Sequence, residues 1–316
     1  MYKHLIKIST LNMPHEEWLW HRQKSIGGSD AASILGLNEY VSPYHVWADK
    51  LGMIPPTEDN EAMRQGRDLE DYVAKRFCEA TGKKVRRENS IITNPDYPFA
   101  HANVDRMIVG EDAGLECKTT SSLNLRKFKN GEFPANYYVQ CVHYMMVTGA
   151  KKWYLGVLVF GRQFMWFEIE RDEAEIEALA KSEATFWELV ESKTAPIVDG
   201  SASTTETINS IYSDADSSES VSLFGFDADL DTYMALTAQI KHLEALKDEC
   251  ANNVKAFLEN ASRGASDRYR VSWAPQSIQT FDSKAFAKDH PEMDLSKYYK
   301  TSNYRTFKVN EITKEI

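Results

Sequence analysis

The sequence predicts an α+β, or mixed α/β, fold for the first 195 of its 316 residues. Apolar residues at spacings of three or four, which are typical of helices, alternate with short strand-like stretches. The strand-like stretches occur in pairs around short turns, which gives the order helix, helix, strand pair, helix, strand pair, helix. A hydrophobic content of 42% is sufficient for a sizeable core.

The expected elements are placed by their apolar faces and by glycines at their ends. In order along the chain they are a short helix from Ala31, a helix over 63–81 ended by Gly82, strands over 99–109 and 115–119, a helix over 136–148 ended by Gly149, strands over 151–160 and 163–169, and a helix over 172–193.

Two further segments follow this core, which spans residues 1–195. Residues 196–228 are acidic and rich in Ser and Thr, so we expect an exposed linker. Residues 229–316 begin with the pattern of a long amphipathic helix and continue with strand-like stretches over 269–273 and 304–309. The pattern favours an accessory helix and small β element packed on the core over a free coiled coil, because it barely reaches the few heptads that a coiled coil needs.

The charge distribution is compatible with nucleic-acid binding, although the net charge is −10. Eight carboxylates and no Lys or Arg lie between Thr194 and Ile240, so the rest of the chain carries only −2. No apolar run is long enough to span a membrane, the first residues lack a signal-peptide pattern, and the four cysteines lack zinc-binding spacing. We expect a cytoplasmic protein with reduced thiols and no membrane partner.

The residues that indicate a chemistry are Asp105 and the tripeptide Glu116-Cys117-Lys118. Side chains alternate between the faces of a strand, so Glu116 and Lys118 share a face, and Asp105 lies beside them across the predicted hairpin. A bound Mg²⁺ relieves the repulsion between two such carboxylates, and a lysine stabilises or helps to deprotonate an attacking water. The pattern predicts metal-dependent phosphodiester hydrolysis; its alternative is an ordinary solvated Glu-x-Lys pair.

The stretch from Arg22 to Gly36 places Gly-Gly-Ser29-Asp30 before an apolar run. It lacks the Gly-Lys-Ser/Thr end of a nucleotide-binding P-loop. Ser29 or Asp30 is expected to cap a helix from Ala31. A helix start with a hydroxyl group and a nearby arginine also binds phosphate, which is the second interpretation of this stretch.

Several ordered segments together resemble the YqaJ-like viral recombinase nucleases, which are related to the lambda exonuclease within the PD-(D/E)XK superfamily. The resemblance implies a restriction-endonuclease-like core, with a central mixed sheet flanked by helices. It covers about residues 15–195 and rests on segments 22–32, 42–47, 66–70, 102–105, 114–121 and 138–140.

This resemblance also implies the roles of individual residues. It implies two Mg²⁺ ions per site, which Mn²⁺ could replace, and the implied metal ligands are Asp105, Glu116, the main-chain carbonyl of Cys117, and Glu70 on its helix. Lys118 is the implied catalytic lysine, and Gln140 is implied to lie close to the active site. Arg22 and Ser29 are implied to hold the terminal 5′-phosphate of DNA. Asn103 stands in the phosphate pocket where some relatives carry serine, and Val104 replaces the nominal proline.

The function implied by the resemblance is a DNA exonuclease that degrades linear duplex from 5′ to 3′ and leaves 3′ overhangs for phage-type recombination. The implied partners are double-stranded DNA ends, a single-strand annealing recombinase, and further copies of the chain in a ring, often a trimer, within a bacterial or phage-infected cell. The alternatives are an endonuclease of the same superfamily and a non-catalytic binding or recruitment module.

Weaker features have two interpretations each. His101 lies four residues before Asp105, so it is a metal ligand only if the intervening strand is regular. Four aromatic residues either stack on unpaired bases or fill the core, and the core is favoured; they are Trp18, Trp20, Tyr44 and Trp47.

Overall fold

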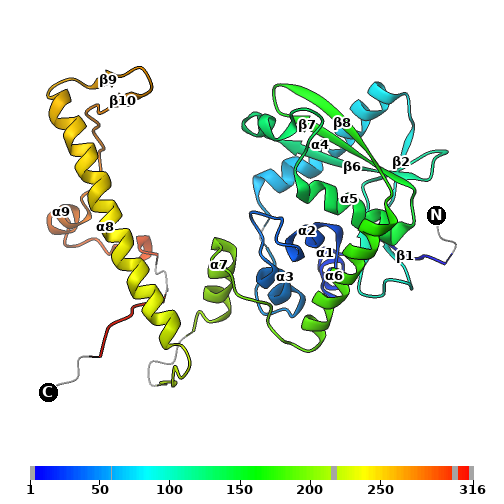
Figure 1. Ribbon diagram of the computed structural model, residues 1–316, viewed down its shortest axis with the longest axis horizontal. Coiled ribbons are helices and arrows are strands. Elements are labelled where there is room, and N and C mark those ends of the chain that lie inside the picture. Colours follow the sequence, from blue (N-terminus) through cyan, green and yellow to red (C-terminus); the bar gives the residue numbers. More distant parts are fainter. Residues whose placement is uncertain (1–3, 58, 215–218, 301–304, 313–316) are drawn as a thin grey trace. The chain divides into compact units, whose positions relative to one another are not determined.

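A five-stranded mixed sheet forms the centre of the first of two compact units, Met1–Tyr212 and Ser213–Ile316. The computed structural model describes residues 4–57, 59–214, 219–300 and 305–312 (Figure 1). The order of the strands in this sheet is β2 (Val85–Arg87), β5 (Arg106–Ile108), β6 (Ala113–Thr120), β7 (Lys152–Val159) and β8 (Gln163–Glu170). Only β6 and β7 are parallel, so the predicted mixed sheet is confirmed.

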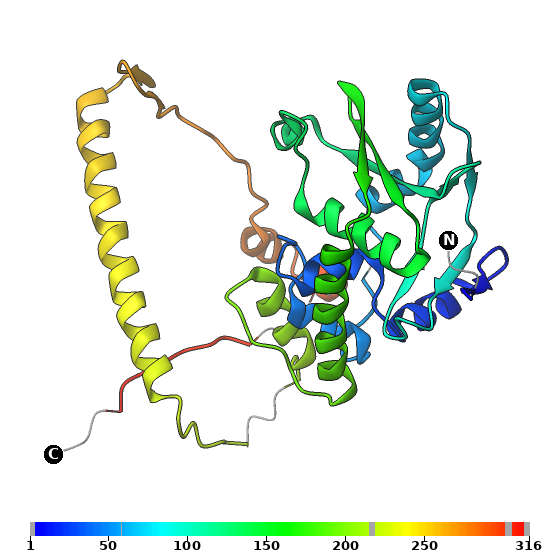
Figure 2. The same ribbon diagram turned by 45° about the vertical axis from the view of Figure 1, so that its right-hand side comes forward.

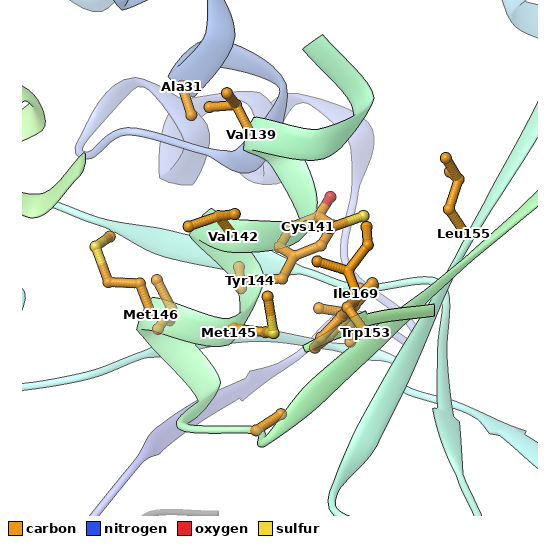
Figure 3. Packing of buried hydrophobic residues seen from close by; sticks show 14 of the residues in the cluster. Ala31, Val139, Cys141, Val142, Tyr144, Met145, Met146, Trp153, Leu155 and Ile169 are labelled. Carbon is orange, nitrogen blue, oxygen red and sulfur yellow. The ribbon is translucent and has the colours of Figure 1, made fainter. Parts of the chain in front are cut away.

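Helices cover both faces of this sheet. On one face, α4 (Glu61–Thr81) packs Ala74 and Phe77 against Leu115 and Tyr154. On the other, α5 (Ala135–Thr148) connects the parallel strands β6 and β7, and its apolar residues join the largest core cluster (Figures 2 and 3). Side chains of β6 therefore point alternately towards α4 and towards α5.

The predicted ends of both helices are confirmed. Gly82 and Gly149 follow α4 and α5 in the left-handed conformation, with φ of 72° and 69°, and their N–H groups close the last helical turns. Glycine adopts this conformation without the steric cost that a Cβ imposes.

A smaller sheet and four helices complete the region before residue 195. The sheet has the order β1 (Ile6–Ser9), β3 (Ser90–Thr93) and β4 (His101–Asn103). The helices are α1 (His15–Gln23), α2 (Gly28–Ile34), α3 (Pro43–Lys50) and α6 (Glu173–Glu191), with a short 3₁₀ helix, η1, at Ser122–Phe128. Ala31 of α2 faces Val139 of α5 in Figure 3, and Leu35 after α2 lines the same small cavity as Tyr138.

The prediction of one strand over 99–109 was wrong. The chain breaks at Val104 and Asp105 into β4 and β5, which belong to different sheets. The Asp105 carboxylate accepts a hydrogen bond from the Cys117 main chain, so it points at β6 instead of alternating along a continuous strand.

The segment expected to be an exposed linker contains a helix, α7 (Ala202–Ile211). Its Thr204 and Thr207 are buried, and the Thr207 hydroxyl lies 2.9 Å from Nδ1 of His45 on α3. The first compact unit accordingly ends at Tyr212 and not near residue 195. Hydroxyl groups that satisfy polar atoms of a neighbouring helix explain why a Ser- and Thr-rich stretch packs here.

The second unit contains the predicted long helix, α8 (Asp227–Leu258), and a two-stranded sheet of β9 (Arg263–Ala265) and β10 (Arg270–Ser272). Short helices follow at α9 (Ser283–Asp289) and η2 (Ser296–Tyr298). The strand expected over 304–309 was wrong for its described residues, because 305–309 have no regular structure, whereas Tyr304 lies outside the described residues. In the described parts of the chain, no helix is both long and apolar enough to cross a membrane.

Candidate active site

Asp105 and β6 form the centre of the candidate site. The Asp105 Oδ2 atom accepts a hydrogen bond of 2.8 Å from the N–H of Cys117, which aligns the carboxylate with the middle of β6. Glu116 and Lys118 flank Cys117 and, by strand alternation, emerge on the α5 side of the sheet. Cys117 packs with the apolar cluster under α4. The structure therefore brings together Asp105, Glu116 and Lys118, as predicted.

Glu116 makes two contacts through one carboxylate oxygen. Its Oε1 lies 2.7 Å from Nζ of Lys118 and accepts a hydrogen bond of 2.8 Å from Nε2 of Gln140 on α5. Its Oε2 is buried and has no hydrogen-bond partner among the described residues. A buried, unpartnered carboxylate oxygen is costly, so this atom is the best candidate for binding a group that the chain itself does not supply.

The charges of this cluster shift the protonation of its members. Burial raises the pKa of Asp105 well above its usual value, and the carboxylates of Glu116 and Glu70 raise it further. Burial alone would lower the pKa of Lys118, but the adjacent Glu116 carboxylate raises it above the usual lysine value. Lys118 is thus a half-buried cation beside the Glu116 carboxylate, and its effect on the pKa of Asp105 is outweighed by burial and the neighbouring carboxylates.

Glu70 is held by an arginine that the sequence alone did not reveal. It lies on α4 and accepts a hydrogen bond from the Arg106 guanidinium, whose Nη2 also lies 2.6 Å from Asp71. The Arg106 side chain is only 4% exposed. Nη1 of Arg106, which donates to Glu70, also donates a hydrogen bond of 2.7 Å to the main-chain carbonyl of Asp105, so Glu70 borders the cluster although its carboxylate is already paired.

The donors at this site fit a hard divalent cation. Within the described residues, no three side chains of Asp, Glu, His and Cys form a ready metal-binding group. The unpartnered Oε2 of Glu116 and the Asp105 carboxylate nevertheless supply two acidic oxygen donors, beside which Lys118 is the cation paired with Glu116. Mg²⁺ is commonly bound by one or two carboxylates together with water and phosphate oxygens, so this sparse set suits it.

Arg22 and Ser29 meet at the start of α2. Nη2 of Arg22 donates a hydrogen bond of 3.0 Å to the Ser29 hydroxyl, and its guanidinium lies 4.9 Å from the centre of the Trp18 ring. Ser29 follows the first residue of α2, where main-chain N–H groups lack helical partners. A guanidinium, a hydroxyl and free N–H groups are groups that anions bind, so this is the candidate anion site, with the Asp30 carboxylate 3.7 Å from Arg22.

The predicted cap at Ser29 or Asp30 was wrong in detail, because α2 begins at Gly28 and Gly27 is its N-cap. Asp30 is the third residue of the helix, and its Oδ2 accepts a hydrogen bond from the N–H of Gly27. The same oxygen lies 2.6 Å from Nζ of Lys50, which is fully buried. Burial alone would raise the pKa of Asp30, but Lys50 and Arg22 lower it well below its usual range.

Tyr144 joins the two groups of residues and was missed by the sequence analysis. Its hydroxyl accepts a hydrogen bond of 2.8 Å from Nε2 of Gln140, the same nitrogen that donates to Glu116. Its ring packs against Gly28, where an added Cβ would lie only 2.5 Å from a ring carbon. A tyrosine four residues after Gln140 lies on the same helix face, and this spacing was the available signal.

The remaining candidates, Asn103 and His101, lie on β4. The Oδ1 of Asn103 is buried without a hydrogen-bond partner in the described regions, so Asn103 makes no hydrogen bond to Arg22 or Ser29 through that atom. His101 is buried, and its Nδ1 lies 2.8 Å from the Ser25 hydroxyl, so it does not join Asp105.

The four aromatic residues have different environments. Tyr44 and Trp47 are core residues, as favoured. Trp18 supports Arg22, and Trp20 is exposed.

The mixed sheet between helices carries Glu116 and Lys118 on its central strand β6, with the Asp105 carboxylate bonded to that strand, an arrangement that is typical of the class of nuclease to which the lambda-type exonucleases belong. A family profile for the YqaJ-like viral recombinase domain matches residues 17–151. The protein YqaJ of Bacillus subtilis (strain 168) is 39% identical over 306 residues, which cover 95% of this chain and 96% of that protein. The chain belongs to the YqaJ-like viral recombinase family.

Two solved structures each resemble somewhat more than half of the chain. The alkaline exonuclease LHK-Exo from Laribacter hongkongensis is 22% identical, with a TM-score of 0.47 and coverage of 56% of this chain and 93% of that one. A phage-related exonuclease from Haemophilus somnus 129PT is 13% identical, with a TM-score of 0.41 and coverage of 54% and 96%.

Proposed function

We propose that the protein is a metal-dependent DNA exonuclease that degrades linear double-stranded DNA from 5′ to 3′ and leaves 3′ overhangs for phage-type recombination. The observation that carries this proposal is the convergence of Asp105, Glu116 and Lys118 around a buried, unpartnered carboxylate oxygen. Family membership and the Arg22–Ser29 anion site support it.

Each group has a distinct role in this proposal. Asp105, Glu116 and the Cys117 carbonyl would hold Mg²⁺, which supplies charge stabilisation and an activated water when bound. Lys118 directs its positive charge at the phosphate oxygen on which negative charge develops. Gln140 fixes the Glu116 carboxylate by hydrogen bonding to Oε1, and Oε2, which has no partner among the described residues, would be available to a metal.

A second metal and an assembly are further parts of the proposal. Glu70 would serve a second Mg²⁺ or Mn²⁺ ion, for which it must exchange its present bond with Arg106. Asn103 would extend the phosphate pocket of Arg22 and Ser29. We also propose a homo-oligomeric ring, such as a trimer, that acts in the cytoplasm with a single-strand annealing partner.

The proposal is tested by incubating linear and covalently closed circular duplex with Mg²⁺. We expect digestion of the linear DNA only, and at least a 100-fold loss of rate in Lys118→Ala because the charge at the reacting phosphate is removed. Lys152→Ala is the matched control, since Lys152 pairs with Glu168 and Glu170 on the exposed edge of the sheet. Efficient cutting of circles would instead indicate an endonuclease, and undiminished activity in Lys118→Ala would refute the assigned site.

A further inference from the structure

A cavity of about 320 Å³ adjoins the candidate active site. Its floor includes Thr120, which is two residues beyond Lys118 on the same face of β6. Tyr137 of α5 forms another side, and Nζ of Lys118 lies 5.3 Å from the centre of its ring. The cavity therefore lies next to the proposed catalytic lysine, with the Tyr137 ring between them.

Three residues on one face of α5 show the order in which the anion site, the carboxylates and the cavity follow one another along this helix. Tyr144 packs against Gly28 beside the Ser29 anion site, Gln140 contacts Glu116, and Tyr137 borders the cavity. Residues four and three apart lie on one helix face, about 6 Å and about 4.5 Å apart along its axis. The anion site and the cavity thus lie on opposite sides of the carboxylates.

The order of these positions determines which part of a DNA strand reaches the cavity. If the terminal 5′-phosphate lies at Arg22 and Ser29 and the reacting phosphate lies at Glu116, the terminal nucleotide lies between them. The cavity then faces the next nucleotide, on the 3′ side of the reacting phosphate. This step rests on the proposed function.

The chemistry of the cavity suits a nucleobase better than a phosphate. Its charged lining consists of two carboxylates and one ammonium group, from Glu39, Glu132 and Lys127, which disfavours an anion. Aromatic rings and the amides of Asn124 and Asn136 supply stacking faces and hydrogen-bonding groups. Bases stack on such rings with little regard to sequence.

Tyr40 is the ring best placed to stack, since it lines the cavity and is 76% exposed. Its loop is fixed to α2: Gly36 adopts φ of 69°, and the Asn38 side chain accepts a hydrogen bond from the N–H of Tyr40 and donates one to Ser33. An ion pair of 3.3 Å between Glu39 and Lys127 crosses from this loop to η1. Both partners are exposed, so opening this pair costs little.

We propose that this cavity binds the unpaired base of the second nucleotide of the cleaved strand, with Tyr40 as its stacking platform. Occupation of the cavity places the reacting phosphate against Lys118, and the bound nucleotide becomes the new 5′ terminus after cleavage. Because stacking contributes to binding every base, the site favours unpairing without selecting a sequence.

The test uses 5′-phosphorylated duplexes whose first two nucleotides are mismatched, so that pairing is absent throughout. One duplex has all its bases, one has an abasic residue at nucleotide two, and one has it at nucleotide one. The rate constant of the first cleavage is measured in single turnover, at several protein concentrations, for the native protein, Tyr40→Ala and Tyr40→Phe. Tyr72→Ala is the matched control, because Tyr72 is an exposed tyrosine on α4 outside the cavity.

We expect the abasic residue at nucleotide two to slow the native protein about 10-fold. Tyr40→Ala should lose the same factor on the complete duplex and nothing further on that abasic duplex, whereas Tyr40→Phe and Tyr72→Ala should match the native protein. The proposal would be overturned if Tyr40→Ala lost the same factor in rate on the complete duplex and on the duplex with an abasic residue at nucleotide two, or lost no rate on either. It would also be overturned if the rate depended on the base at nucleotide one instead.

A measurement without cleavage separates this inference from the proposed activity. With 2-aminopurine at nucleotide two and EDTA present, fluorescence should be quenched when the native protein binds and should remain high with bound Tyr40→Ala. Quenching without any nuclease activity in Mg²⁺ would retain the base site and refute the proposed function. Nuclease activity without Tyr40-dependent quenching would retain the function and refute the base site.

Discussion

At the scale of single residues, Arg22 has the most specific expected effect. Its guanidinium is held by the Ser29 hydroxyl and the Trp18 ring, and its charge is balanced in part by Asp30 at 3.7 Å. A planar guanidinium that is fixed on several sides is prepared to make paired hydrogen bonds to a phosphate.

Arg22→Ala should therefore reduce cleavage of 5′-phosphorylated ends about 10- to 100-fold, to the rate observed with 5′-hydroxyl ends. The measurement compares both ends in the same buffer. Lys24→Ala is the matched control, since Lys24 is a nearby cation that stacks on Trp20 instead. A preference for phosphorylated ends that survives in Arg22→Ala would exclude Arg22 from the phosphate site.

His101 makes the stability of the fold sensitive to acid. Burial, and secondarily the charge of Lys50, lower its pKa from 6.5 to about 3. The unfolded chain takes up a proton at this residue near pH 6.5, whereas the folded chain does so only near pH 3. The stability that the fold gains by keeping His101 neutral is thus fully present above pH 6.5 and is lost as the pH falls from 6.5 towards 3.

As the pH falls through that window, we expect the protonation of His101 to lower the free energy of unfolding by up to about 1.4 kcal/mol per pH unit. Urea unfolding at pH 6.5 and pH 4.5 measures the effect, and His101→Gln should show a shallower pH dependence. His290→Gln is the control, because His290 is a partly exposed histidine in the second unit. Equal slopes for the native protein and His101→Gln would contradict the assignment.

At the scale of elements, the packing of α2 on α5 depends on a glycine. A Cβ at Gly28 would meet the Tyr144 ring at 2.5 Å, whereas a Cβ at Gly66, within α4, would meet its nearest neighbour, Thr119, only at 4.0 Å. The two positions therefore form a matched pair of helical glycines with opposite steric surroundings.

Gly28→Ala should lower the free energy of unfolding by about 1–3 kcal/mol because it separates two packed helices. Gly66→Ala should raise it by up to about 1 kcal/mol, since alanine has the higher helix propensity. Denaturant titrations compare the two variants. If Gly28→Ala is as stable as the native protein, the close packing of α2 on Tyr144 is wrong.

At the scale of the whole molecule, the buried apolar residues all lie in the first unit among the described parts of the chain, and the last of them is Val190. Helix α7 follows Val190 in the chain and is hydrogen-bonded to the start of α3; one of these bonds, of 3.0 Å, runs from the N–H of Ser42 to the hydroxyl of Ser203. The cooperative core should thus extend through Tyr212 and require nothing after it.

A chain ending at Tyr212 should unfold within a few degrees of the full-length protein in a thermal melt. A chain ending at Ala195 lacks α7 and should lose on the order of 2–4 kcal/mol, from the hydrogen bonds of Thr207 and Ser203 and the burial of Ile208 and Ile211. Equal melting temperatures for both shortened chains would place the boundary near residue 195 after all.

The sequence by itself determined the features that depend on local conformation. Gly82 and Gly149 end helices because a left-handed residue is needed there, and Glu116 and Lys118 share a face because a strand alternates. Both kinds of feature are determined by residues close together in the chain, so pattern and spacing predict them.

The features that join distant segments became visible only in the folded chain. The strand break at Asp105 depends on an N–H group twelve residues away, and Lys50, Arg106 and Tyr144 acquire their partners from other elements. The packing of α7 likewise depends on His45, 162 residues before Thr207. Such contacts depend on how segments fold together, and no local pattern encodes them.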